Sequence, residues 1–165
     1  MDKYYYLISQ LPTLFFGKEP AITIDKFLEE AGKWLTPGDL KRLNSLDLNG
    51  FESAKGDHPI VTSFKTFEMK IRRDIAHWRE AKKRDQEYKP TSFPLSILKE
   101  ADPLEAELKL MERRWDFLDE LEREYSFDFA VVLLYYLKLQ LLRRYYQFNN
   151  EKGLQKFQKL YEVEV

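Results

Sequence analysis

The sequence lacks cysteine altogether and has few of the residues that break helices. Without cysteine, the 165-residue chain has no disulfide, no zinc–thiolate or iron–sulfur ligand and no thiol nucleophile, which fits a reducing cytoplasm. Only 6 glycines and 7 prolines interrupt a chain in which 33% of the residues are charged. This composition is typical of long helices with charged outer faces.

The chain also lacks a strong net charge and a long apolar run. Its 27 basic and 28 acidic residues leave a net charge of -1, so no field of the whole molecule attracts nucleic acid or an anionic membrane. The most apolar stretch, residues 129–142, contains Lys138 and Gln140 and is shorter than the about 20 residues of a spanning helix. Polar residues interrupt the opening stretch 4–17, unlike a signal peptide. We therefore expect a protein that does not span a membrane.

Apolar residues recur at helical spacing along nearly the whole chain. Tyr4, Leu7, Ile8 and Leu11 follow the i, i+3, i+4, i+7 pattern, so we expect the opening tyrosines to belong to the core. The aliphatic residues within 129–137 lie on nearly all faces of their helix, which predicts that this helix is central in the bundle. The same reasoning predicts helices at residues 24–35, 36–46, 60–88, 103–125 and 127–148, and a short last helix from 154 onward. Thr23, Thr36 and Asp102 are the predicted N-terminal caps of the first, second and fourth of these helices.

These patterns predict an all-α, single-domain helical bundle with two or three long antiparallel helices and shorter N-terminal helices, since no alternating strand run competes. One domain over residues 1–165 suits a chain of this length. Within it we expect short helices over 1–48, an exposed loop over 49–59 and a long-helix bundle over 60–165. Two long helices differ in charge, the first being rich in basic residues and the second in acidic ones. We expect them to be antiparallel, with opposite charges at their seam.

Residue types that carry catalysis or hold cofactors are sparse. His58 and His77 are the two histidines, and they lack the companion spacing of metal ligands. The sequence has no Gly-rich phosphate loop, nucleophile elbow or His-Glu-x-x-His motif, so we predict no enzyme, no bound metal and no cofactor. One enzymatic alternative stays open, a buried carboxylate site around Glu68 and Asp74.

Basic residues beside aromatic ones mark two candidate contact surfaces. Residues 70–84 surround Trp78 with basic side chains, and residues 142–148 place two arginines beside two tyrosines, as some RNA-binding faces do. Acidic residues interrupt the first stretch, so we rank a protein partner above RNA. Alternatively, these charges simply pair with the acidic helix opposite. The candidate interface residues are Glu68, Arg72, Arg73, Arg79, Arg143 and Arg144.

Three segments carry a family resemblance that covers nearly the whole chain. They are YYYLISQLPTLFFG, FEMKIRRDIAHWREAKKR and DPLEAELKLMERRWDFLDELEREYSFDFAVVLLYYLKLQLLRRY. Together they resemble an uncharacterised bacterial family whose members are typically encoded among V-type ATPase subunits. The genomes concerned often lack a separate gene for the C subunit, which is called d in eukaryotes.

A more distant similarity leads to the C subunit itself, an all-helical adaptor that seats the rotating central stalk on the membrane-embedded ring. Glu68 and Arg79 match the first and last positions of its repeated polar helix pattern, while Lys70 and Arg73 replace an Asp and an Asn. The resemblance implies a non-enzymatic structural or accessory subunit of a V-type ATPase or ATP synthase. It also implies protein partners, no small-molecule substrate and a cytoplasmic place peripheral to the membrane. A free-standing helical protein- or RNA-binding module is the alternative.

Overall fold

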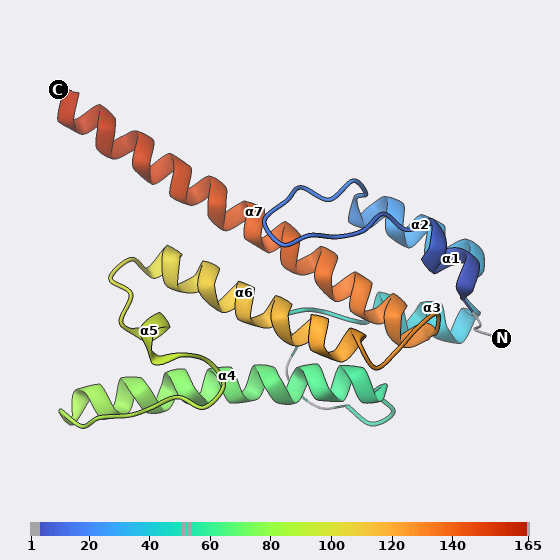
Figure 1. Ribbon diagram of the computed structural model, residues 1–165, viewed down its shortest axis with the longest axis horizontal. Coiled ribbons are helices and arrows are strands. Elements are labelled where there is room, and N and C mark those ends of the chain that lie inside the picture. Colours follow the sequence, from blue (N-terminus) through green and yellow to red (C-terminus); the bar gives the residue numbers. More distant parts are fainter. Residues whose placement is uncertain (1–3, 51, 53, 165) are drawn as a thin grey trace.

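Helices and their connections make up the described chain (Figure 1). This computed structural model describes residues 4–50, 52 and 54–164, with the backbone alone for residues 151, 152, 154–157 and 159–164. No strand occurs in these described ranges, which confirms the predicted all-α class. The helices are α1 (Tyr5–Gln10), α2 (Ile24–Trp34), α3 (Pro37–Asn44), α4 (Pro59–Lys83), α5 (Leu95–Leu98), α6 (Pro103–Glu122) and α7 (Phe129–Glu164).

The three long helices, α4, α6 and α7, are antiparallel in succession, as predicted (Figure 1). α6 returns along α4, and the rings of Phe67 and Phe117 stack between them with centroids 4.1 Å apart. α7 then returns along α6, and the short helices α1 to α3 lie near its first half (Figure 1). The C-terminal part of α7 extends beyond the other helices (Figure 1).

α7 is the central helix because its first half is apolar on nearly all sides. Residues 130–134, 136–139, 141 and 142 are all buried, which confirms the predicted central position. The predicted separate helix from Leu154 is wrong, because α7 continues without a break through Gly153 to Glu164. A lone glycine costs a helix only about 1 kcal/mol, and no proline follows it. The side chains predicted to line that last helix lie outside the described residues.

The opening tyrosines divide between the core and the surface. Tyr4 and Leu7 are 3% and 0% exposed, whereas Tyr5 and Tyr6 are 47% and 65% exposed. The expectation that the opening tyrosines all belong to the core is therefore wrong for Tyr5 and Tyr6. The reason is helical geometry, since positions three apart share a face while adjacent positions point in different directions.

Predicted caps begin three of the helices. The side-chain oxygens of Thr23, Thr36 and Asp102 each accept a hydrogen bond from a backbone N–H in the first turn of α2, α3 and α6. α4 ends at Lys83, earlier than the predicted position. It ends there because Asp85 adopts a φ of 54°, a left-handed conformation that does not continue a helix.

Candidate interaction groove and the ion pairs behind it

Three of the six predicted interface residues belong to one chain of ion pairs across α4, α6 and α7. Glu68, which is 3% exposed, accepts two hydrogen bonds from the guanidinium of Arg114, whose side chain is 7% exposed. Arg114 Nη1 lies 3.5 Å from the carboxylate of Glu107, which pairs in turn with Arg144 Nη2 at 3.0 Å. At the other end Arg72 Nε lies 3.7 Å from Glu68. Alternating charges thus connect the three long helices.

At the α4–α6 seam, each paired side chain has a charge opposite to the overall charge of its own helix. Glu68 is an acid on the predominantly basic helix, and Arg114 is a base on the predominantly acidic one. A buried seam has room for few charges, because each charge must be paired to offset its loss of solvation. Glu68 therefore lies inside the bundle, while Arg73 and Arg79 are exposed on the outer side of α4.

Asp74, the second acid of the enzymatic alternative, holds the connection that follows α4. Its Oδ1 accepts a hydrogen bond from the Tyr88 hydroxyl at 2.6 Å, and its Oδ2 accepts from the backbone N–H groups of Thr91 at 3.2 Å and Ser92 at 2.9 Å. Burial alone would raise the pKa of Asp74, but the hydrogen bonds from Ser92, Tyr88 and Thr91 hold that pKa below its ordinary value. Glu68 and Asp74 are thus each bonded to separate structural partners.

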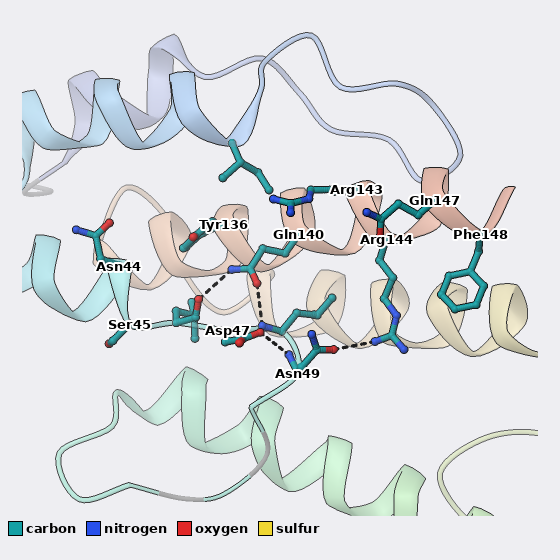
Figure 2. A pocket seen from close by; sticks show the side chains of 13 residues that line it. Asn44, Ser45, Asp47, Asn49, Tyr136, Gln140, Arg143, Arg144, Gln147 and Phe148 are labelled. Carbon is teal, nitrogen blue, oxygen red and sulfur yellow. Dashed lines mark hydrogen bonds between the residues drawn. The ribbon is translucent and has the colours of Figure 1, made fainter. Parts of the chain in front are cut away.

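Arg143, the remaining predicted interface residue, and Arg144 from the ion-pair chain line a groove on α7 (Figure 2). The groove has a volume of about 660 Å³ and lies between the start of α2, the connection that follows α3 and the middle of α7. Polar side chains dominate its lining, among them Asn44, Asn49, Tyr136 and Gln147. We call it the α7 groove.

Gln140 fixes one wall of the α7 groove. Its Oε1 accepts a hydrogen bond from the backbone N–H of Leu48 at 2.8 Å, and its Nε2 donates to the carbonyl oxygen of Leu46 at 3.0 Å (Figure 2). The connection after α3 is thereby tied to α7. Sequence reasoning treated Gln140 only as a polar interruption of an apolar run. The signal for this role was a polar side chain inside an otherwise apolar stretch, because a buried amide needs hydrogen-bond partners.

The two arginines of the α7 groove differ in how they are engaged. Arg144 donates to Asn49 Oδ1 at 3.1 Å and to Glu107 at 3.0 Å, and its guanidinium lies 5.7 Å from the centroid of the Phe148 ring. Arg143 is exposed and makes no hydrogen bond or ion pair within the part of the chain that the structure describes. Its positive charge is therefore available to a molecule outside the chain.

Tyr136 lies in the α7 groove with only 9% of its surface exposed. Its ring packs against Phe27, with centroids 5.7 Å apart, while its hydroxyl has no hydrogen-bond partner among the described residues. Burial raises the pKa of Tyr136, the carboxylate of Asp47 raises it further, and Arg143 acts in the opposite direction. The phenol is neutral at physiological pH and offers an O–H donor to the groove.

Comparisons with family models, with curated proteins and with solved structures gave no match. Within the described ranges, no group of three or more His, Cys, Asp or Glu side chains is placed to hold a metal ion. None of the described helices combines the length and the apolar character needed to cross a membrane.

Proposed function

We propose that this protein is a non-enzymatic helical subunit or accessory factor of a V-type ATPase or ATP synthase, in the place of the central-stalk C subunit. The resemblance of its three segments to the family encoded among V-type ATPase subunits motivates the proposal. The structural observation that carries it is the ion-paired body of α4, α6 and α7. An adaptor in a rotary machine transmits force, so it needs a stiff body rather than a catalytic group.

The ion pairs support a stiff body because they connect helices that lie far apart in the sequence. Glu68 and Arg114 are 46 positions apart, and Glu107 and Arg144 are 37 apart. Each buried charge is held by its partners, so the helices cannot slide past one another without leaving a charge unpaired. α7 adds a continuous rod of 36 residues, about 54 Å long at about 1.5 Å per residue. A rod that extends beyond the bundle is suited to contact a second body.

The competing functions receive less support from the same geometry. The carboxylate enzyme needs Glu68 or Asp74 accessible to a substrate, yet both are buried at 3% and 4% exposure and fully engaged. RNA binding would use the five arginines of the candidate interface, of which Arg72 and Arg144 already pair with carboxylates. A protein adaptor requires neither a free acid nor a continuous basic track.

Co-purification from the native cell tests the proposal. A tagged full-length copy is captured under gentle conditions, and its partners are identified and quantified by mass spectrometry, with an unrelated tagged helical protein as the control. We expect several V-type ATPase subunits in amounts comparable to the bait. Recovery of no ATPase subunit, or of equal amounts with the control protein, overturns the proposal.

A further inference from the structure

We propose that the α7 groove docks a carboxylate-bearing segment of a protein partner, with Arg143 as its main contact and the Tyr136 hydroxyl as a second donor. This inference rests on the proposed function, because it takes the partner to be a protein, and it adds the chemistry by which that partner is recognised. Three features of the groove support it: its unused donors, its charge and its rigidity.

The unused hydrogen-bonding groups of the α7 groove are mainly donors. Arg143 presents a guanidinium with five N–H groups in a planar fork, a shape that matches the two oxygens of a carboxylate. The Tyr136 hydroxyl adds another donor, and the amides of Asn44 and Gln147 make no side-chain hydrogen bond among the described residues. A ligand rich in acceptor atoms fits this arrangement.

An unpaired guanidinium in the groove favours an anionic ligand. Asp47, the acid in the lining, keeps its negative charge, because the hydrogen bond that its Oδ1 accepts from the backbone N–H of Asn49 at 2.9 Å comes from a neutral group. Arg143 also borders a neighbouring groove with Glu19 and Asp25, and none of these three acids lies within ion-pair distance of it. The guanidinium of Arg143 therefore has no carboxylate partner among the described residues, and a ligand carboxylate would complete a bidentate pair with it.

Tyr136 supplies a second donor to the groove. Its hydroxyl has no hydrogen-bond partner in the described chain, and it is not one of the buried polar atoms that lack a partner, so it reaches the open space of the groove. Tyr136 lies in the lining of the groove on the same helix as Arg143, two turns earlier (Figure 2). A ligand oxygen bound by Arg143 or beside it would accept a hydrogen bond from this hydroxyl.

The walls of the groove are held in place before a ligand arrives. Gln140 ties the connection after α3 to α7 through two hydrogen bonds, and Arg144 holds Asn49 from the same helix (Figure 2). A preorganised site spends little of its binding energy on ordering its own side chains.

A single unpaired guanidinium fits one carboxylate, whereas an RNA strand needs a track of basic groups along its backbone.

A titration of the labelled full-length protein tests the groove. The probe is hexaglutamate, followed by amide shifts in ¹⁵N spectra and by anisotropy of a fluorescein label, with hexaglutamine, inorganic phosphate and oligouridine as comparisons. We expect hexaglutamate to shift the amides of residues 44–49 and 140–147. Arg143→Glu should weaken its binding about tenfold or more, and Arg143→Gln somewhat less. Tyr136→Phe should weaken it about threefold.

Arg123→Glu is the matched control, because Arg123 is an exposed arginine at the end of α6, outside the groove and outside the candidate interface. We expect it to change the affinity less than twofold, and melting curves establish that each variant is folded. An equal loss with Arg123→Glu and Arg143→Glu overturns the inference. So does the absence of groove shifts with millimolar hexaglutamate, or equal binding of hexaglutamine, phosphate or oligouridine.

Co-purification with the same variants separates failure of the groove from failure of the proposed function. If wild type and Arg123→Glu retain V-type ATPase subunits while Arg143→Glu loses them, both proposals are supported. If Arg143→Glu retains them as well as wild type does, the groove assignment is wrong and the proposed function stands. If wild type recovers none, the proposed function is wrong, and the peptide titration alone decides the chemistry of the groove.

Discussion

Removing one side of the buried Glu68–Arg114 pair should destabilise the protein far more than removing both sides. In Glu68→Leu the guanidinium of Arg114 stays buried, with only Glu107 3.5 Å away to offset its charge. Arg114→Leu leaves Glu68 buried with only Arg72, whose half-exposed side chain lies 3.7 Å away. In each case an ion remains inside the bundle without its close hydrogen-bonded partner.

The expected cost of each single substitution is about 3–5 kcal/mol, the usual range when one partner of a buried pair is removed. The double variant Glu68→Leu/Arg114→Leu removes both desolvated charges and fills the seam with apolar side chains. Replacing a buried pair in this way is often neutral or stabilising, so the double variant should lie within about 1 kcal/mol of wild type or above it. Glu107 keeps its pair with Arg144 at 3.0 Å in that variant.

Urea unfolding followed by circular dichroism measures these differences, provided that the slope of the free energy with urea stays constant among variants. The control is Arg72→Ala, which removes a side chain with 46% exposure from the same carboxylate and should cost under about 1 kcal/mol. The reasoning is refuted if either single substitution costs less than about 1 kcal/mol, or if the double variant is no more stable than the singles.

Three further perturbations test the polar contacts that hold the connections. Asp74→Asn should cost about 1.5–3 kcal/mol at neutral pH, because it weakens charge-assisted hydrogen bonds from Ser92 and its neighbours. Since folding lowers the pKa of Asp74, its contribution exists above the ordinary value of 3.8 and is lost as the pH falls through the lower folded value. The difference between wild type and Asp74→Asn should therefore shrink in urea titrations below pH 3.8. His58 caps α4 through its Nδ1, and burial lowers its pKa, so wild type should lose stability as the pH falls below 6.5, whereas His58→Asn should not. Gln140→Leu leaves two backbone groups unpaired, so it should cost about 1–3 kcal/mol and speed hydrogen exchange at the Leu48 amide.

Each of these perturbations has an outcome that contradicts it. If the free energies of unfolding of wild type and Asp74→Asn differ by the same amount at pH 7 and pH 3, the ionised carboxylate of Asp74 contributes no more to stability than an amide does. A parallel loss of stability in wild type and His58→Asn near pH 6 would place the titrating group elsewhere. Unchanged exchange at Leu48 in Gln140→Leu would mean that the wall of the α7 groove is held by other contacts. Gln147→Leu is the control for Gln140→Leu, and it should change stability by less than about 0.5 kcal/mol because Gln147 is exposed.

The sequence predicts the helices well because their signals are local. Thr23, Thr36 and Asp102 cap the helices they were expected to cap, and the apolar residues within 129–137 correctly predicted that α7 is central. Where local signals were weak, the predictions failed. Gly153 and the residues after it contain no strong stop signal, and the long helix continues through them, so the predicted break before Leu154 is absent.

The sequence predicts the site less well, since the site depends on contacts between distant segments. Arg143 and Arg144 look alike in the sequence, yet only Arg144 reaches Glu107, and only Arg143 keeps its charge free in the described structure. Glu68 was a candidate for an interface or for a buried carboxylate site, and its contact with Arg114, 46 positions away, makes it part of a buried ion pair. Gln140 acquires its role from a backbone N–H 92 positions away.

The amino-acid sequence by itself therefore determined the all-α class and the placing of most helices, because periodicity and capping act within a few residues along the chain. Tertiary structure alone decided which charges are buried and paired, which arginine stays available and where a groove opens on α7. Those outcomes follow from desolvation, whose cost to a charged group depends on what the packed helices bring next to it.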